Sequence, residues 1–338
     1  MVEKIRESAA EFKIDEIGFC GAEALKEEGA RFKKWLSDGM HAGMHWLAKD
    51  PSLRSDPAKL IENARTVIVA LLRYGTQSPT QDPSAPLFSH YSLYADYHTV
   101  FGKRLKSLAR FIRESLPHSN TYASVDTGRV LERAFAVKAG MGFRGKNTSL
   151  IHPRFGANCF IGVIITDAEI SFAAPPEVEN GCGGCDLCLK ACPTGALVKP
   201  YSLDARKCIS YHTIENRGEI PDWIKEKTGN RVFGCDECYN ACPYNKWDNE
   251  TGEISIPRLI EPKKQNIESL LDMDEREFRK RFSQTPVSRA GCNGLKRNAI
   301  ICAGNSGRKS LASLLSVFTA DESPILSRTA EWAIKKLS

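Results

Sequence analysis

The sequence lacks the apolar segments that membrane insertion or export would require. No window contains eighteen consecutive apolar residues, so no membrane-spanning helix is predicted. The first six residues, Met-Val-Glu-Lys-Ile-Arg, lead directly into an amphipathic pattern without the apolar region of a signal peptide. We therefore expect a cytoplasmic protein, whose reducing surroundings favour free thiols over disulfides.

The sequence also lacks a recognisable phosphate-binding loop. The glycine-rich turn at residues 140–152 matches neither the G-x-G-x-x-G nor the Walker spacing. Its glycines nevertheless allow the backbone to approach a bound group closely. With 338 residues, of which 42% are hydrophobic, the chain is long enough for two or three domains.

Positive charge is concentrated near the C-terminus. The formal net charge is only +6, but residues 276–310 contain nine basic residues and one acid, Glu277. The basic residues are Arg276, Arg279, Lys280, Arg281, Arg289, Lys296, Arg297, Arg308 and Lys309. Such a surface suits a polyanion such as nucleic acid, although a solvated basic face near helix ends explains the pattern equally well.

Eight of the twelve cysteines lie between Cys182 and Pro243. The first four form the run Cys182-Gly-Gly-Cys185-Asp-Leu-Cys188-Leu-Lys-Ala-Cys192-Pro193, which has the C-x2-C-x2-C-x3-C-P spacing of bacterial two-cluster ferredoxins. A second run, Cys235-Asp-Glu-Cys238-Tyr-Asn-Ala-Cys242-Pro243, has one cysteine fewer. Cys208 lies between the two runs and brings the total to eight, which is enough for two 4Fe-4S clusters.

The spacing of the first run predicts that the clusters exchange ligands. Three sulfurs of this run reach one cluster, while the fourth points away to the other. The predicted ligand sets are Cys182, Cys185, Cys188 and Cys242 for one cluster, and Cys192, Cys208, Cys235 and Cys238 for the other. Paired zinc sites or a disulfide scaffold are the alternatives, because C-x2-C pairs also suit tetrahedral zinc.

An α/β domain is predicted ahead of the cysteines. Helices are expected at residues 2–12, 29–36, 94–116 and 130–139, and strands at residues 14–20, 66–74, 122–125 and 158–166. The apolar, β-branched run from Thr66 to Tyr74 is typical of a strand buried on both faces. We place the α/β domain at residues 1–175 and a ferredoxin-like domain at 176–250.

Residues 251–338 are predicted to be helical. The expected helices are 267–271, 276–282, 295–303, 309–318 and 326–337, joined by short turns. Antiparallel helices of this kind resemble a single HEAT-type repeat, which must pack on the rest of the protein to bury its apolar face.

Asp126 stands at the end of a predicted strand, in the turn before a helix. Such an aspartate often caps the helix, but ligands of open α/β sheets also bind outside the carboxyl ends of strands. The segment Tyr94-Ala95-Asp96-Tyr97-His98 opens the longest predicted helix. Its ionisable side chains are able to line a pocket, although Asp96 is equally well placed to be a helix cap.

These motifs together closely resemble the epoxyqueuosine reductase family, from residue 1 to about residue 320. The resemblance is carried by Gly43-Met44-His45-Trp46, Tyr94-Ala-Asp-Tyr-His98, Val125-Asp126 with Leu131-Glu132-Arg133, Gly140-Met-Gly-Phe-Arg-Gly-Lys146-Asn147, the run from Cys182 to Pro193, Cys208-Ile-Ser-Tyr-His212 and Gly234-Cys-Asp-Glu-Cys238. It implies a cobalamin-binding, nitroreductase-like α/β domain, two 4Fe-4S clusters and reduction of epoxyqueuosine to queuosine in the tRNA anticodon loop. Because the sequence stops after about one helical repeat, we expect some tRNA contacts of longer members to be missing.

The resemblance also implies roles for individual residues. Asp126 is expected to be the proton donor, and we expect burial beneath the cofactor and substrate to raise its pKa. The residues that the resemblance places near cobalamin are Lys49, Ser92, Asp126, Leu150, His152, Ser210, Tyr211 and Asp236. The Asp-x-His-x-x-Gly cobalamin signature is absent, so no histidine ligand to cobalt is expected, and Ser92 or water is expected near the metal.

The implied partners are tRNA and an external electron donor, with the protein acting as a monomer. Lys296 and Arg297 are expected to contact tRNA phosphates. A reductive dehalogenase would use the same cofactors, but those enzymes resemble exported proteins with twin-arginine signals, which this sequence does not show at its start. A simple electron carrier would need only residues 181–245 and would leave the α/β domain unexplained.

Overall fold

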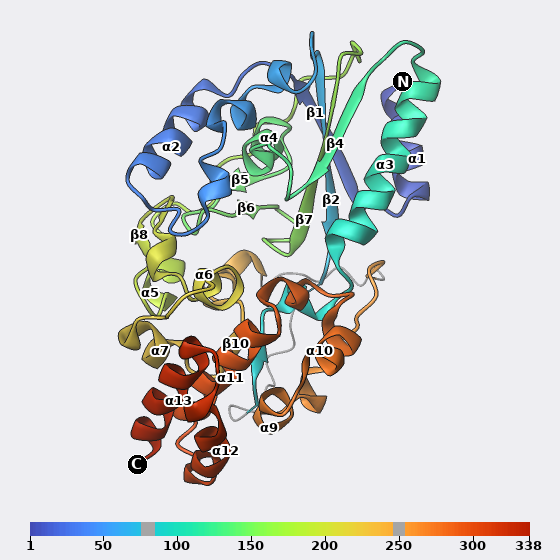
Figure 1. Ribbon diagram of the computed structural model, residues 1–338. Helices are drawn as coiled ribbons and strands as arrows, with labels where there is room; N and C mark the ends of the chain where they lie inside the picture. The colour runs from blue at the N-terminus through green and yellow to red at the C-terminus, as the bar shows by residue number, and fades with distance from the viewer. Residues whose placement is uncertain (76–84, 246–253) are drawn as a thin grey trace.

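The computed structural model of the protein describes residues 1–75, 85–245 and 254–338 (Figure 1). A four-stranded sheet with the order β1-β2-β7-β4 forms the centre of the N-terminal part. These strands span Glu16–Gly21, Thr66–Arg73, Cys159–Thr166 and Thr121–Val125, respectively. Each neighbouring pair is antiparallel, so β2 and β4 point the same way on either side of β7.

Strand β2, one of the two inner strands, is buried along its whole length, as its continuous apolar sequence predicts. Its side chains alternate between two cores. Ile68, Ala70 and Leu72 face one core, and Val67, Val69 and Leu71 face the other. Burial of each of the larger side chains stabilises the fold by roughly 2 kcal/mol.

Helices cover the two faces of this sheet unequally. On one face α1 (Val2–Glu11) and α3 (Tyr97–Ser115) pack side by side, and their apolar stripes point into the larger core (Figure 1). On the other face lies the short helix α4 (Glu132–Lys138), which buries Phe135 and Ala136 against the sheet. Helix α2 (Lys26–Ser37) lies further out on the same side (Figure 1).

The carboxyl ends of β2 and β4 meet at one edge of the sheet. Arg73 pairs with Cys159, and Val125 pairs with Gly162, so both strands end beside the beginning of β7. This edge faces the cysteine-rich region (Figure 1). Asp126 follows β4 directly and therefore lies between the two parts of the molecule.

The cysteine-rich region is built from short elements. They are α5 (Leu187–Ala191), β8 (Leu197–Lys199), β9 (Ser202–Leu203), α6 (Ile209–Ile214), α7 (Asp222–Thr228), β10 (Arg231–Phe233) and α8 (Glu237–Asn240). Helices α5 and α8, which lie within the two cysteine runs, pack against each other. The two runs are therefore brought together although about fifty residues separate them in the sequence.

The C-terminal part is helical, as predicted. It contains α9 (Ile267–Leu271), α10 (Glu275–Phe282), α11 (Cys292–Asn305), α12 (Ala312–Ser316) and α13 (Pro324–Leu337). Helix α11 is the buried centre of this group and packs against α13 on one side and β10 on the other. Among the described residues, no helix has the length and apolar character needed to cross a lipid bilayer.

The three predicted regions share a core instead of folding around separate ones. Strand β3 (Leu87–Phe88) belongs to the N-terminal region of the sequence but pairs in parallel with β10 of the cysteine-rich region. The larger core runs from α1 and α3 through Phe233 to the C-terminal helices. The predicted boundary at residue 250 lies in the segment 246–253, outside the described residues.

One hairpin-like pairing completes the N-terminal part. Strands β5 (Phe143–Arg144) and β6 (Leu150–Ile151) pair antiparallel and enclose the glycine-rich turn. Gly142 lies so close to Ile151 that a Cβ atom would come within 2.3 Å of its carbonyl oxygen. The glycine in this turn is thus explained by contact between two backbones.

Candidate functional site

The seven cysteines of the two runs and Cys208 between them are free thiols, and all are half-buried. Burial raises the pKa of the Cys188 thiol, and the neighbouring thiols of Cys182 and Cys242 raise it further. Cys242 likewise has Cys182 and Cys185 among its charged neighbours. Cys242 therefore belongs to the group of the first run, as the predicted ligand exchange requires.

The remaining four cysteines form a second group. Burial raises the pKa of Cys238, and Cys235, Cys208 and Cys192 contribute to the rise. Within residues 1–75, 85–245 and 254–338, no three His, Cys, Asp or Glu side chains are positioned to hold a single metal ion.

The glycine-rich turn of the α/β part holds the first cysteine run in place. Lys146 Nζ donates hydrogen bonds to the carbonyl oxygens of Gly183 and Cys185, at 2.6 and 2.8 Å. Ser149 Oγ donates to the Tyr239 hydroxyl at 2.9 Å, beside the second run. The turn thus contacts both cysteine runs.

Asp126 lies at the edge of the sheet with a left-handed backbone, φ 56°. Its Oδ2 accepts a hydrogen bond from the Tyr97 hydroxyl at 2.9 Å and lies 3.2 Å from His98 Nε2. The other ring nitrogen, His98 Nδ1, lies 2.7 Å from Asp96 Oδ1. An imidazole between two carboxylates, with a phenol beside it, forms a connected chain of acidic and basic groups.

The electrostatics of this chain place the proton on His98. Burial disfavours the charged imidazole, but the hydrogen bonds with Asp126 and Asp96 outweigh it and raise the pKa of His98 to about 9. For Asp126 burial alone would raise the pKa, but hydrogen bonds from His98 and Tyr97 hold it below its ordinary value of 3.8. In this structure Asp126 is therefore the ionised partner of a charged histidine. The raised pKa expected from the sequence refers to Asp126 buried beneath cofactor and substrate, and it stays a prediction.

The sequence alone does not reveal a separate role for Tyr97 or His98. Both belong to the segment 94–98 at the start of α3, whose ionisable side chains are able to line a pocket. Asp96 is the N-cap of α3, with its carboxylate accepting from the backbone N–H of His98 at 3.0 Å. Asp96 is therefore a helix cap, and its carboxylate also fixes the position of the His98 ring.

The N-terminal part contacts the cysteine-rich and C-terminal parts at an interface beside Asp126, which we call the seam. The backbone N–H of Gly43 donates to the Tyr211 hydroxyl at 2.9 Å, and the backbone N–H of His90 donates to Asp236 at 2.6 Å. The Arg289 guanidinium lies over the Trp46 ring, 5.3 Å from its centre. Three segments that the sequence associates with a cofactor thus reach the same seam.

The predicted cofactor contacts divide into two sets. Lys49 is exposed, and Ser210, Tyr211 and Asp236 are half-buried beside or along the seam. By contrast, Ser92, Leu150 and His152 are 0%, 3% and 3% exposed. Their side chains are already engaged inside the protein, so the geometry does not support contact with a cofactor through them.

The engagements of the buried set are specific. Ser92 Oγ donates to the Ser89 carbonyl at 2.7 Å. His152 Nδ1 accepts from the backbone N–H groups of Arg154 and Phe155, and its Nε2 lies 3.3 Å from Glu16. The Ser92 hydroxyl thus directs its proton to the Ser89 carbonyl.

Unpartnered polar atoms surround the same region. His41 Nδ1, Ser89 Oγ and Glu132 Oε1 are buried without a hydrogen-bond partner. His41 belongs to the loop that reaches Tyr211, Ser89 lies against Gly234 next to Cys235, and Glu132 is a charged neighbour of Asp126. Buried polar atoms normally have partners, so this set fits a bound group that carries its own donors and acceptors.

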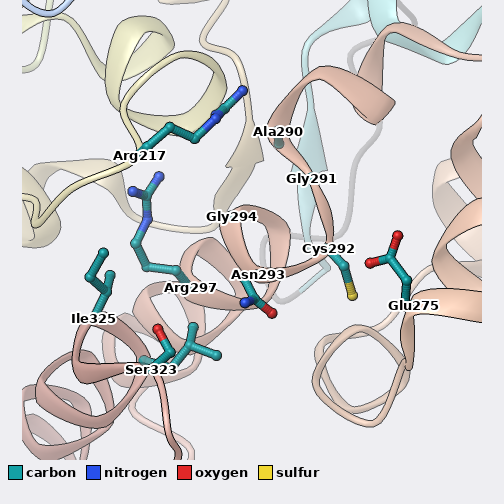
Figure 2. Close-up of a pocket in the computed structure, with 11 residues that line it drawn as sticks. Arg217, Glu275, Ala290, Gly291, Cys292, Asn293, Gly294, Arg297, Ser323 and Ile325 are labelled. Atoms are coloured by element: carbon teal, nitrogen blue, oxygen red, sulfur yellow. The ribbon is translucent and has the colours of Figure 1, made fainter.

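The structure corrects the prediction for Arg297. This side chain is 2% exposed and donates to the carbonyl oxygens of His212, Asn216 and Gly218. In Figure 2 it extends from α11 toward the segment that carries Arg217, beside a surface cavity of about 330 Å³. Arg297 therefore joins α11 to the cysteine-rich region and is not free to contact phosphate. Lys296 is half-buried, with Nζ 5.8 Å from the centre of the Phe318 ring.

The fold and the two cysteine groups define the class of protein: a redox protein with two 4Fe-4S centres beside an α/β domain. In agreement, a family model described as "4Fe-4S double cluster binding domain" matches residues 181–245. A second model, "Epoxyqueuosine reductase QueG, DUF1730", matches residues 54–127. The epoxyqueuosine reductase of Gloeobacter violaceus is 38% identical over 310 residues, covering 90% of this chain and 96% of that protein.

Solved structures agree over nearly the whole chain. An epoxyqueuosine reductase crystallised with an epoxyqueuosine-modified tRNA-Tyr stem loop is 32% identical, with a TM-score of 0.91, and the match covers 99% of this chain and 89% of that one. The Bacillus subtilis epoxyqueuosine reductase, with its catalytic aspartate loop swung out of the active site, is 31% identical, with a TM-score of 0.89 over 99% and 90% of the two chains. The chain belongs to the epoxyqueuosine reductase family.

We expect Cys242→Ala to lose one cluster and keep the other. Iron content should fall from about eight to about four atoms per chain, since a cubane that loses one thiolate ligand is destabilised. Cys208→Ala should have the same iron content but retain the other cluster, so the reduced variants should give different electron paramagnetic resonance spectra. Cys159→Ala, outside both groups, should keep about eight irons. Identical spectra for the two ligand variants would contradict the exchange of ligands.

The charged His98 should make stability depend on pH. Its folded pKa of about 9 lies above its ordinary value of 6.5, so the stabilisation is complete below pH 6.5 and is lost as the pH rises through 9. The melting temperature of wild type should therefore exceed that of His98→Gln at pH 6 by more than at pH 10. A difference that stays constant between these pH values would show that His98 is not held as a cation.

Proposed function

We propose that the protein reduces epoxyqueuosine to queuosine in tRNA, using cobalamin and electrons relayed by two 4Fe-4S clusters. The observation that carries this proposal is the Asp126 carboxylate, held by Tyr97 and His98 at the sheet edge that faces the cysteines. The full-length similarity to epoxyqueuosine reductases supports it. We place this reaction in the cytoplasm.

Reduction of an epoxide to an alkene consumes two electrons and two protons and releases water. His98 holds a proton at neutral pH and is hydrogen-bonded to Asp126. Asp126 takes this proton and donates it to the departing epoxide oxygen. His98 is then reprotonated from solvent and supplies the second proton by the same route, so that the oxygen leaves as water. Asp96 keeps the imidazole oriented throughout, because its carboxylate binds the far ring nitrogen.

Cobalamin would lie in the seam, with Lys49, Ser210, Tyr211 and Asp236 toward it. When bound, it supplies a reduced cobalt that delivers electrons to the epoxide carbon. The chain's own residues do the rest: Asp126 delivers the proton, and the seam between the two parts holds the substrate away from water. We propose that none of the described histidines at this seam is a ligand of the cobalt.

The two clusters have different surroundings. Asp236 follows Cys235 directly and accepts a hydrogen bond from His90 across the seam, so the cluster of Cys192, Cys208, Cys235 and Cys238 is the one that adjoins the active site. Near the other cluster, Gly183 and Gly184 face open space, and Leu187 is 46% exposed. An external one-electron donor would reduce the protein at this outer cluster.

For tRNA, we propose contact through the C-terminal basic region, which includes Lys296. A related enzyme has been crystallised with a tRNA stem loop, and a modified base in such a loop is reached by unstacking it. The functional division remains residues 1–175 for nitroreductase-like cobalamin binding, 176–250 for the ferredoxin-like clusters and 251–338 for a HEAT-like tRNA-contacting region. The protein is proposed to act as a monomer.

The decisive experiment compares wild type with Asp126→Asn. The variant should contain about eight irons, take up cobalamin and bind epoxyqueuosine-modified tRNA, but its turnover should fall by about 10²- to 10⁴-fold because the proton donor is missing. Turnover is measured as queuosine formed, with halogenated aromatics as competing substrates. Undiminished turnover of the variant would contradict the mechanism. Dehalogenation without queuosine formation would favour a reductive dehalogenase.

Lys296 and Arg297 should differ in their effects on tRNA binding. Lys296→Ala should weaken binding and reduce the slope of log affinity against log salt by about 1, because one phosphate contact is lost. Arg297→Ala should instead destabilise the fold, on the order of 3 kcal/mol, because three buried carbonyl groups lose their donor. Thermal melts and a salt titration of tRNA binding measure the two effects. An unchanged salt slope for Lys296→Ala would exclude its phosphate contact.

A further inference from the structure

The loop that carries Asp126, residues 126–131, has few internal hydrogen bonds. In the described part of the chain, its one main-chain hydrogen bond to the end of β4 runs from the Thr127 N–H to the Val125 carbonyl, at 2.6 Å. Asp126, Thr127 and Arg129 are exposed, and Asp126 adopts a left-handed backbone. A loop of this kind depends on neighbouring residues to hold it in one conformation.

Arg54 supplies two of the bonds that hold the loop. Its Nη1 donates to the Gly128 carbonyl at 3.0 Å, and its own carbonyl accepts from the Leu131 N–H at 2.8 Å. The main chain of Arg54 is thus fixed at the end of the loop while its side chain reaches the middle. Gly128 packs closely here, since a Cβ atom would overlap the Ser124 hydroxyl.

Arg54 is an unusual structural arginine. It is 8% exposed, its Nε has no hydrogen-bond partner, and no carboxylate of the described residues forms an ion pair with it. Burial lowers the pKa of Arg54, with Glu132 the strongest opposing charge and Asp126 and Tyr122 further neighbours. A buried cation without an acidic partner is costly, so a stabilising role in packing alone does not account for it.

Glu132 lies below the same loop and also has an unmatched atom. Its Oε1 is buried without a partner, although Arg54 and Arg133 are both charged neighbours. Burial raises the pKa of Glu132 to about 8, and Asp126 adds to the rise. At neutral pH the carboxyl group is therefore mostly neutral and does not compete with the Gly128 carbonyl for the Arg54 guanidinium.

We propose that Arg54 is the positioning residue of the Asp126 loop: its guanidinium clamps the Gly128 carbonyl so that Asp126 stays against His98 and Tyr97. Arg54 does not touch the reacting atoms. Its effect on catalysis rests on the proposed function, whereas its effect on the loop does not.

Trypsin cleavage after Arg129 tests the clamp directly in the full-length protein with its cofactors. Arg54→Met should increase the rate at which the fragment ending at Arg129 appears, by about tenfold or more, and Arg54→Lys should be intermediate because it keeps the charge and one donor. Fragments are identified by mass spectrometry. Arg104→Met is the matched control, because Arg104 also binds backbone and side-chain groups but in a different region.

The same variants separate positioning from simple instability. In Arg54→Met, kcat for epoxyqueuosine-modified tRNA should fall by about 10- to 100-fold with little change in KM, because a displaced acid slows proton transfer without affecting tRNA contacts. Cleavage that is unchanged at Arg129, or that rises equally at sites throughout the chain, would overturn the proposal. Increased cleavage at Arg129 in a protein that proves inactive on this tRNA would support the clamp and reject only the proposed reaction.

Discussion

The return of Cys242 to the first cysteine run is the constraint on which the rest of the structure depends. Because Cys242 lies with Cys182, Cys185 and Cys188, the chain must return to its starting point after about fifty residues. This return brings Asp236 and Tyr239 to the seam and places β10 where β3 and α11 can pack on it. The contact between the two cysteine runs thus sets the positions of groups that are not themselves cysteines.

A second requirement is charge balance in a partly buried site. Asp126 and Asp96 would repel each other across a short distance, but the charged His98 between them makes both stable as anions. The site consequently stores a transferable proton on nitrogen, next to a carboxylate that can pass it on. In the proposed mechanism the general acid is therefore a pair of residues: His98 holds the proton and Asp126 delivers it.

Much of the fold could be predicted because local patterns decide it. The helices, the buried strand β2 and the cysteine groups follow from periodicity and spacing, which need no knowledge of distant contacts. What the sequence could not show were long-range relations: the antiparallel pairing of the sheet, the bond of Tyr97 with Asp126, and the burial of Arg297 beneath carbonyl groups about eighty residues away. Local charge counting treated Arg297 as a surface cation, because nothing near it in the sequence reveals its partners.

The pairing of β3 with β10 means that neither half of the molecule is a self-sufficient module. A strand of the N-terminal part lies along the edge of the cysteine-rich part, and residues 93–95 also bind the backbone of residues 257–260. A cysteine-rich segment moved into another protein would carry an uncovered edge that invites aggregation.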